Sequence, residues 1–396
     1  MSWPVSKLED LCHFIKNGKS IQQSKEINGL PITRIETIAN QSIDTSRVGY
    51  AGVSVESAGD FLLEVGDILF SHINSLEHLG KAAIYKGYPE KLVHGMNLLN
   101  LRPDKSKVDC DYLLRALRAP VTKGKLLRIA NKSVNQASIA AGNLKKIEIP
   151  LPPLSEQRRI AAILDKVDAL RAKRREAVAK LDQLLQSVFL EMFGDPVTNP
   201  KGWPVLSIQE ACESIVDCVN RTAPTVDYVT DYKMIRTTNV RNFKVSLDSV
   251  RYVEKVIFDD WNRRLLPQKG DVILTREAPA GEAGVLDSDD QVFLGQRLML
   301  YRVNQQRATP EYLLYSFMGE GMQQQFKKQS SGSTVKHLSV PDCRSWDLML
   351  PPVELQKKFT GIVAMNWSLR QQALAHSNRL KDLFFSVQKS AFSAGP

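Results

Sequence analysis

The sequence feature that most constrains the fold is an internal repeat. Ile149-Pro150-Leu151-Pro152-Pro153-Leu154 recurs as Leu348-Met349-Leu350-Pro351-Pro352-Val353 at an offset of 199 residues, and the register then holds without a gap for roughly forty residues. The preceding segments repeat more loosely, at offsets between 199 and 204: Trp3-Pro4-Val5 returns as Trp203-Pro204-Val205, and Gly95 returns as Gly295. This self-similarity indicates two tandem copies of one unit.

The better-matched part of each copy has the pattern of a long helix. In the first copy Pro152-Pro153 blocks an earlier start, Ser155 suits the N-cap, and Gly194 followed by Pro196 marks the end. Between these signals apolar residues alternate by three and four positions, which is the spacing of a coiled-coil seam. Because a large domain separates the two helices in the chain, we expect them to pair within the chain in antiparallel orientation.

The expected core of this helix pair consists of apolar residues at matching positions of the two copies. Its members are Ile160, Ile163, Val167, Leu170, Leu181, Leu184 and Val188 in the first helix, and Phe359, Ile362, Leu369, Leu380, Leu383 and Val387 in the second. A plainer alternative is that both are amphipathic helices that pack only on their own domains. The basic cluster Arg171-Ala172-Lys173-Arg174-Arg175 fits a solvated helix face or a DNA contact.

The variable part of each copy reads as a mixed domain of strands and short helices. Residues 31–38, 61–71, 81–85 and 97–102 are short, rich in Ile, Leu and Val, and separated by turn residues, so they predict strands. Residues 111–117 and their match 311–317 predict a helix. We therefore expect an α+β fold: two tandem mixed domains (1–153 and 197–352), separated by two long antiparallel helices (154–196 and 353–396) with pseudo-twofold repetition.

The charge of the chain favours a polyanionic partner. The net charge is +10 at neutral pH, and each neutralised phosphate of DNA releases condensed counterions. The five cysteines form no Cys-x-x-Cys pair and read as reduced thiols. No apolar run is long enough to span a bilayer, and the N-terminus does not resemble a signal peptide, so we expect a cytoplasmic protein without membrane contact.

The motifs of an enzyme are missing from the sequence. There is no Gly-x-x-x-x-Gly-Lys-Ser/Thr phosphate loop, no Asn/Asp-Pro-Pro-aromatic motif of amino-methyltransferases, and no zinc pattern among the six histidines. The fragment Pro103-Asp104 is not followed by a Glu-x-Lys at nuclease spacing. We therefore predict no catalytic residue, no metal site and no cofactor in this chain.

Polar and basic residues gather in loops that differ between the two copies, although the framework around them matches. Arg, Lys, Asn and Gln can read base edges, whereas Ser, Thr and Lys suit phosphates; an ordinary solvated loop is the alternative in each case. For Arg34 and Arg236 the alternative is a neighbouring carboxylate. The DNA-binding candidates are Lys16, Asn17, Lys19, Ser20, Gln22, Gln23, Arg34, His72, Asn74, Lys132, Asn135 and Gln136 in the first copy, and Asn220, Arg221, Arg236, Arg241, Arg276, Lys327, Lys328, Ser331 and Ser333 in the second.

The helix boundaries carry a family resemblance. Leu151-Pro152-Pro153-Leu154-Ser155-Glu156-Gln157-Arg158-Arg159-Ile160, with Phe193-Gly194-Asp195-Pro196 and Trp203-Pro204, resembles the specificity subunits of type I restriction–modification systems over the whole length of the chain. The second copy departs from this pattern, because Glu354-Leu355-Gln356 stands in place of the Glu-Gln pair, shifted by one residue.

The resemblance implies a subunit that binds double-stranded DNA and reads a split, asymmetric target, one half-site per recognition domain. The helices would set the spacer between half-sites and dock two methyltransferase subunits, and motor–nuclease subunits would join the complex. S-adenosylmethionine, ATP and Mg²⁺ would belong to those partners. Two other classes remain open from the sequence: a stand-alone DNA-modifying enzyme with an unrecognised active site, and a helical protein-interaction scaffold.

Overall fold

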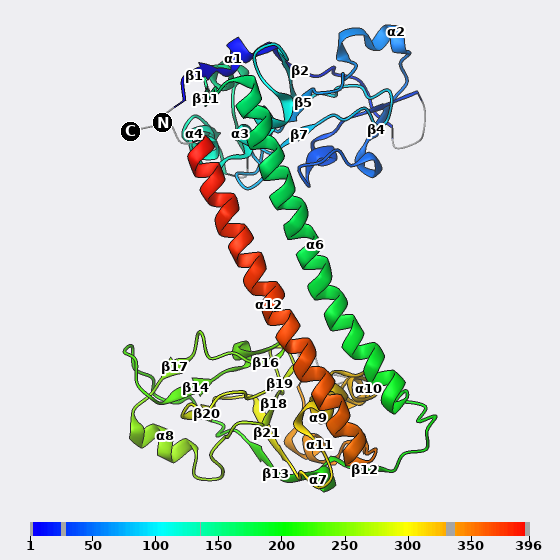
Figure 1. The fold of residues 1–396 in the computed structure, drawn as a ribbon, viewed down its shortest axis with the longest axis vertical. Coiled ribbons are helices and arrows are strands. Elements are labelled where there is room, and N and C mark those ends of the chain that lie inside the picture. The colour runs from blue at the N-terminus through cyan, green and yellow to red at the C-terminus, as the bar shows by residue number, and fades with distance from the viewer. Residues whose placement is uncertain (1–2, 25–28, 135, 330–336, 393–396) are drawn as a thin grey trace. The chain divides into compact units, whose positions relative to one another are not determined.

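The computed structural model describes residues 3–24, 29–134, 136–329 and 337–392 (Figure 1). The chain forms two compact units: unit 1 contains residues 1–174 and 376–396, and unit 2 contains residues 175–375. Each long helix therefore contributes one half to each unit. No helix among the described residues is both long and apolar enough to cross a membrane.

Unit 1 is built on a four-stranded antiparallel sheet of order β2-β8-β5-β7, accompanied by the three-stranded sheet β6-β10-β9 and the pairs β1-β11 and β3-β4. Its strands are β1 (Val5–Lys7), β2 (Cys12–Asn17), β3 (Leu30–Ile32), β4 (Gly49–Ala51), β5 (Ile68–Phe70), β6 (Ile73–Asn74), β7 (Ala82–Ile84), β8 (Leu99–Pro103), β9 (Asn131–Lys132), β10 (Ala137–Ser138) and β11 (Glu148–Pro150). Its short helices are α1 (Leu8–Leu11), α2 (Val55–Ala58), α3 (Cys110–Arg118), α4 (Pro120–Arg128) and α5 (Ala141–Lys145), with 3-10 turns η1 (Ile35–Ile38), η2 (Thr45–Arg47) and η3 (Gly59–Phe61).

Unit 2 repeats this plan with a larger sheet of order β13-β21-β18-β19-β16-β15, a three-stranded sheet β17-β14-β20 and the pair β12-β22. Its strands are β12 (Val205–Ser207), β13 (Cys212–Asp217), β14 (Lys233–Ile235), β15 (Val240–Arg241), β16 (Phe243–Val245), β17 (Arg251–Tyr252), β18 (Val272–Thr275), β19 (Ala283–Val285), β20 (Val292–Leu294), β21 (Leu298–Val303) and β22 (Asp347–Met349). Its short helices are α7 (Ile208–Ala211), α8 (Lys255–Trp261), α9 (Pro310–Met318), α10 (Glu320–Gln329) and α11 (Val340–Ser345), with the 3-10 turn η4 (Thr237–Asn239).

The predicted α+β class and the two long helices are confirmed. The helices are α6 (Leu154–Phe193) and α12 (Val353–Phe392), each of 40 residues. The predicted short helix appears as α3 and as α9, whose N-caps Asp109 and Thr309 accept hydrogen bonds from Tyr112 N and Tyr312 N. The strands are shorter than expected: residues 35–38 form a 3-10 turn, and β5 covers only Ile68–Phe70 of the predicted strand 61–71.

One buried glutamine joins each long helix to its domain. The Gln157 side chain accepts from Asp109 N (2.8 Å) and donates to the carbonyls of Lys107 (3.2 Å) and Pro152 (2.8 Å). In unit 2 Gln356 makes the same bonds, with Thr309 N (3.0 Å) and the carbonyls of Arg307 (3.0 Å) and Pro351 (2.8 Å).

This match explains how Glu354-Leu355-Gln356 in the second copy differs from Glu156-Gln157 in the first. The glutamine keeps both its position in the repeat and its partners, so only the glutamate has moved.

The two long helices lie side by side in antiparallel orientation within each unit (Figure 1). In unit 2 Asn366 Nδ2 donates to the Leu181 carbonyl (3.0 Å), whereas further along α6 the Phe193 ring contacts Phe359 at 5.4 Å between centroids. In unit 1 the Arg171 guanidinium lies 5.1 Å from the centre of the Phe384 ring. The helices also complete both domain cores, since Leu164 and Phe392 pack into unit 1 and Phe189 and Phe359 pack into unit 2.

The predicted helix seam was wrong at four leucines. Leu170, Leu184, Leu369 and Leu383 are 39%, 51%, 47% and 48% exposed. Ile160, Val167 and Phe359 are buried, whereas Ile163, Leu181, Val188, Ile362, Leu380 and Val387 are half-buried.

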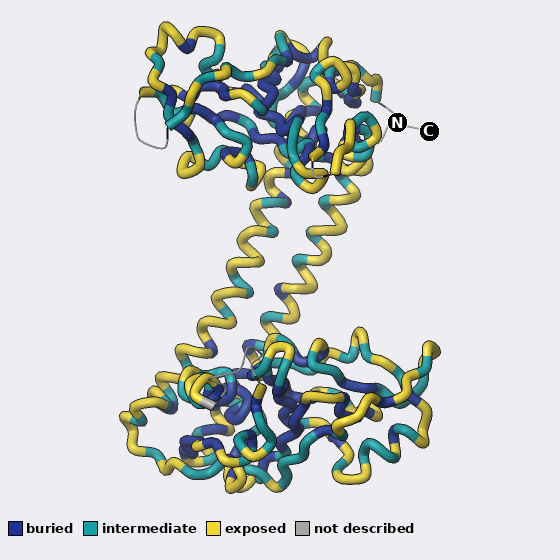
Figure 2. The backbone as a smooth tube through the Cα atoms, turned by 180° about the vertical axis from the view of Figure 1, so that it is seen from behind, coloured by how far each residue is buried: buried dark blue, intermediate teal, exposed yellow. Residues whose placement is uncertain are grey.

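The less exposed stripe has the same three-and-four spacing. It keeps alternate positions of the predicted seam, such as Val167 and Leu380, and lies one residue later at the positions between them. Its members are Leu164, Val167, Arg171, Val178, Leu181, Leu185, Val188 and Met192 in α6, and Val363, Asn366, Arg370, Ala373, Ser377, Leu380, Phe384, Val387 and Ala391 in α12. Figure 2 shows that elsewhere along both helices most residues are exposed. Each helix thus carries two apolar stripes, and only one of them faces the partner helix.

Candidate nucleic-acid interface

A repeated glycine turn lies at the centre of the candidate site in each unit. A Cβ on Gly95 would lie 2.1 Å from the Thr33 carbonyl oxygen, and one on Gly295 would lie 2.6 Å from the Ile235 carbonyl oxygen. The turns are held there by hydrogen bonds from Gly95 N to Thr33 Oγ1 (2.9 Å) and from Gly295 N to Ile235 O (2.8 Å). Only glycine permits this approach, so both domains keep the same backbone at this place.

The loop at residues 16–23 packs directly on this turn in unit 1. Lys19 N donates to His94 O (2.9 Å), and Met96 N donates to Lys19 O (3.1 Å). The Lys19 ammonium donates to Ser57 O (2.5 Å), and the Lys16 ammonium lies 4.4 Å from the centre of the Phe14 ring. The backbone of this loop is therefore fixed, while Asn17, Ser20 and Gln22 remain exposed.

Arg34 and Arg236 occupy the same place beside the glycine turn. Each begins a 3-10 turn, with Arg34 N bonded to Thr37 Oγ1 (2.8 Å) and Arg236 N bonded to Asn239 Oδ1 (2.9 Å). Arg34 Nε donates to Gln23 (2.8 Å), and its Nη1 lies 3.6 Å from Glu36. Arg236 Nη2 donates to Ser249 O (3.0 Å). Both guanidinium groups thus already have protein partners, including a carboxylate for Arg34.

His72 and Arg276 are a second matching pair, and both are buried. His72 O accepts from Ile139 N (2.8 Å), as Arg276 O does from Leu338 N (3.0 Å). Burial lowers the pKa of His72. Burial also lowers the pKa of nearby His94 to about 4, with a smaller opposing effect from its hydrogen bond to Leu98 O. Both histidines are therefore neutral at pH 7 and add no charge to the site.

A small three-stranded sheet brings two predicted loops of unit 1 together. β10 pairs with β6 and with β9, so Ala137 lies opposite both Asn74 and Lys132. Lys132 and Gln136 are exposed, and Asn74 is half-buried with its amide bonded to Ser71 Oγ (3.3 Å). The β9-β10 hairpin thus presents polar side chains on a narrow ribbon.

Other candidates of unit 2 have partners of their own. Arg221 pairs with Asp260 and lies 4.6 Å from the centre of the Trp261 ring, whereas Asn220 is exposed. Arg241 Nη1 donates to the carbonyls of Thr237 (2.7 Å) and Val240 (2.6 Å). The candidates Asn135, Ser331 and Ser333 lie outside the described residues.

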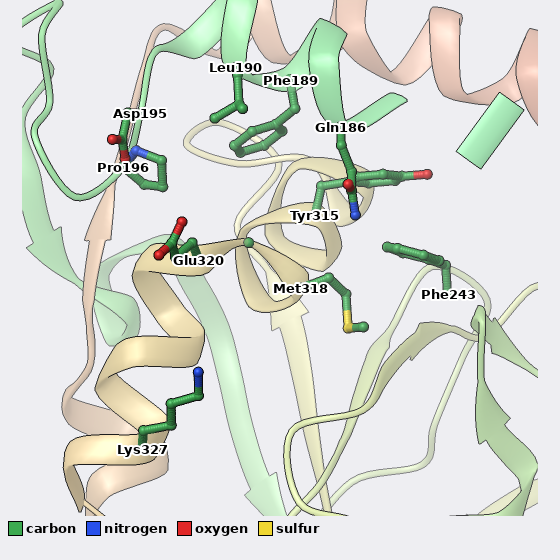
Figure 3. A pocket seen from close by; sticks show the side chains of 11 residues that line it. Gln186, Phe189, Leu190, Asp195, Pro196, Phe243, Tyr315, Met318, Glu320 and Lys327 are labelled. Atoms are coloured by element: carbon green, nitrogen blue, oxygen red, sulfur yellow. The ribbon is translucent and has the colours of Figure 1, made fainter. Parts of the chain in front are cut away.

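Lys327 and Lys328 stand on α10 rather than at the glycine turn. Lys327 extends along one side of a cavity of about 510 Å³ that is lined by Phe189, Phe243, Tyr315 and Met318 (Figure 3). This cavity combines aromatic side chains with polar and charged ones, and it lies at the C-terminal end of α6. Gln323 of the same helix donates to Gly281 O (3.2 Å), so α10 packs against the loop that follows Arg276.

Sequence reasoning missed a charged group beside Arg276. Glu277 lies 2.9 Å from Arg297 Nε and 2.5 Å from His337 Nδ1, and Arg276 N donates to Arg297 O (2.8 Å). The repeated glycine at 95 and 295 was the signal that could have located Arg297, because it marks a turn that the two copies share.

The described residues hold no group of three or more His, Cys, Asp and Glu side chains placed to bind a metal ion. All five cysteines are free. Burial raises the pKa of Cys12, Cys212 and Cys343 to about 12, so these thiols are protonated at neutral pH and unsuited to nucleophilic attack.

The architecture is that of a duplicated recognition protein, and comparison with known proteins gives its family. The model of the type I restriction modification DNA specificity domain matches residues 1–180 and 200–363. The putative type I restriction enzyme MjaX specificity subunit of Methanocaldococcus jannaschii is 32% identical over 367 residues, which cover 90% of this chain and 84% of that relative. The EcoBI specificity subunit of Escherichia coli is 24% identical and covers 78% and 74% of the two chains.

Solved structures share the fold. The crystal structure of the S subunit of a type I system from M. genitalium aligns with a TM-score of 0.59 at 13% identity, covering 100% of this chain and 97% of that one. A chain from a structural study of complex assembly in a type I system aligns with a TM-score of 0.58 at 17% identity, covering 98% and 97%. The chain belongs to the family of type I restriction–modification DNA specificity subunits. The alternatives of a stand-alone enzyme and a helical scaffold have no support in these comparisons.

Proposed function

We propose that this chain reads a bipartite DNA target, with one half-site recognised by residues 1–153 and the other by residues 197–352. The proposal rests on one observation: the backbone around the glycine turns at Gly95 and Gly295 is repeated in both domains, whereas the polar side chains on it differ. We call this repeated backbone the frame. The backbone of the two glycine turns matches. The carbonyls of His72 and Arg276 accept equivalent backbone hydrogen bonds, although the two side chains differ. A constant frame with exchanged polar side chains is what two readers of different sequences require.

Exchange of one domain tests this proposal. Residues 1–150 are replaced by the matching domain of a relative, the chain is expressed with its partner subunits, and the methylated motif is found by methylome sequencing. One half-site should change while the other half-site and the spacer stay, since domains without shared base contacts contribute additively. A simultaneous change of both half-sites would contradict independent reading.

We further propose that the outer apolar stripes of α6 and α12 dock methyltransferase subunits. Leu184 and Leu369 in unit 2, and Leu170 and Leu383 in unit 1, are 39–51% exposed at equivalent repeat positions. Apolar residues at regular helical spacing outside the core mark protein-interaction surfaces. A Leu369→Glu variant should lose co-purification with the methyltransferase but keep DNA binding, whereas Gln371→Glu, at an exposed position on another face of the same helix, should change neither.

The chemistry in this proposal belongs to the partners. The chain contributes recognition only, while S-adenosylmethionine, ATP and Mg²⁺ are bound by methyltransferase and motor–nuclease subunits. Calorimetry of the purified chain with S-adenosylmethionine should show no heat of specific binding, and the chain alone should neither methylate nor cut DNA. Either activity in the pure chain would overturn this assignment.

A further inference from the structure

The residue that follows each repeated glycine turn has an unusual backbone. Asn97 has φ 76° and Arg297 has φ 70°, both in the left-handed region. Asparagine tolerates this conformation, but arginine rarely adopts it, because its Cβ crowds the carbonyl oxygen. A strained conformation kept at the same place in two diverged domains points to a functional constraint on these turns.

Contacts in unit 2 fix the Arg297 side chain as well as its backbone. Arg297 N donates to Cys218 Sγ (3.1 Å), its carbonyl accepts from Arg276 N (2.8 Å), and its Nε lies 2.9 Å from Glu277. The Arg297 side chain is 54% exposed and that of Glu277 only 20%, so a well-anchored carboxylate orients a half-exposed guanidinium. Among the described residues, the terminal nitrogens of Arg297 have no hydrogen-bond partner.

Asn97 occupies the matching place in unit 1. It is half-buried, and within the part of the chain that the structure describes its amide forms no hydrogen bond. The turn around it is held by Gly95 N bonded to Thr33 and by Met96 N bonded to Lys19. The frame thus presents an unengaged amide in one domain and an oriented guanidinium in the other.

We propose that Asn97 and Arg297 are base-reading residues, which recognise an adenine in the first half-site and a guanine in the second. An asparagine amide matches the N6 donor and N7 acceptor of adenine, and an arginine fork matches the O6 and N7 acceptors of guanine. The proposal rests on the proposed function, in which each domain reads its own half-site, and it identifies residues and bases within that reading.

The test uses the full chain assembled with its partner subunits. Arg297→Gly and Asn97→Gly remove each side chain while glycine keeps the left-handed backbone, so the turn and the fold are retained. Methylome sequencing and competition binding with duplexes substituted one base at a time report the preference at each position. Arg297→Gly should lower discrimination at one guanine of one half-site by roughly 5- to 150-fold, and Asn97→Gly should do so at one adenine of the other.

Graded variants and matched controls sharpen the outcome. Glu277→Gln keeps a hydrogen-bond partner for Arg297 but removes the charge, so it should relax the same guanine to a smaller extent. Arg307 is a matched control, since it is 50% exposed and paired with Glu210 at 3.4 Å. Arg307→Ala and the exposed Asn143→Ala should leave the motif unchanged.

Three results separate the possibilities. An unchanged motif in Arg297→Gly would refute base reading by that residue. Uniformly weaker binding to all sequences, with a shallower salt dependence, would show a phosphate contact instead and would also refute it. Absence of any sequence-specific binding by the unaltered complex would refute the proposed function itself, and this inference with it.

Discussion

The buried glutamine at the start of each long helix gives the sharpest test of how the helices are attached to the domains. We consider Gln157→Met, which keeps the length and helix propensity of the side chain but removes its hydrogen bonds. Gln157 is fully buried and bonds to Asp109 N and to the carbonyls of Lys107 and Pro152. The variant therefore leaves three backbone groups without their partner.

The expected cost follows from the burial of those groups. The bond to Pro152 is buried, and leaving such a group unsatisfied costs about 1–3 kcal/mol. The bonds to Asp109 and Lys107 are part-buried, so water can replace the amide, and each contributes about 0.5–1.5 kcal/mol. The free energy of unfolding of unit 1 should fall by roughly 2–6 kcal/mol, a large fraction of the ~5–15 kcal/mol typical of a domain.

Hydrogen exchange resolved by peptide is the assay, because it separates the two units. Gln157→Met should raise exchange in residues 1–174, whereas Gln356→Met should raise it in unit 2. Gln183 is exposed on α6, so Gln183→Met serves as the control and should change stability by no more than about 0.5 kcal/mol. A loss below 1 kcal/mol for Gln157→Met, or faster exchange confined to the other unit, would refute the reasoning.

Three further outcomes are expected. Leu185→Asp should lower the free energy of unfolding by at least about 3 kcal/mol or abolish folding, because Leu185 is 1% exposed and the charge would lack a partner. Leu184→Asp should lower it by about 1 kcal/mol or less. Equal losses for the two variants in denaturant titrations would contradict the assignment of Leu185, rather than Leu184, to the buried stripe. Asn366→Val should stabilise unit 2 by about 1 kcal/mol in urea, since the buried Oδ1 has no partner among the described residues; a clear loss would show that the amide is needed. The pKa of His94 is about 4 when folded and near 6.5 when unfolded, so the unfolded chain binds more protons between these values. The contribution of His94 to the free energy of unfolding is fully present above pH 6.5 and should be lost as the pH falls, by about 3 kcal/mol at pH 4. The His94→Gln variant should lack this pH dependence when its free energy of unfolding is compared with that of the unaltered chain at each pH.

The repeat and the helix ends were predictable because local chemistry decides them. Prolines at 152 and 153 prevent helix before Leu154, and Gly194 adopts φ 85° just after Phe193. The paired prolines recur 199 residues later as Pro351 and Pro352, and Gln356 shows that the repeat extends to individual hydrogen bonds. Such features depend on a few neighbouring residues, so a single sequence contains enough information to place them.

The phase of the helix seam was not predictable in the same way. Ile163, Leu170, Ala177 and Leu184 alternate with polar residues as well as the true seam does, so periodicity alone allows either stripe to face the partner helix. The choice is made by packing, since Leu164 and Leu185 reach the domain cores and thereby fix the rotation of α6. A helix with two apolar stripes needs tertiary contacts to decide between them, and the stripe left over becomes available to another protein.

The proposed base-reading residues Asn97 and Arg297 were not predicted from the sequence for a related reason. Arg236 was selected because it matches Arg34 in a strand-like segment, and Arg241 was selected from loop composition. In the structure both guanidinium groups donate to backbone carbonyls and so hold the local fold. Arg297 follows a strand and a turn that look structural in sequence, yet its side chain is half-exposed and braced by Glu277. The guanidinium groups of Arg236 and Arg241 are therefore less available for base contacts than that of Arg297, the residue proposed above to read a base. The better guide to base contacts is a backbone feature that both copies preserve, such as the turns after Gly95 and Gly295, because a constant frame is what allows the exchanged side chain to determine which base is read.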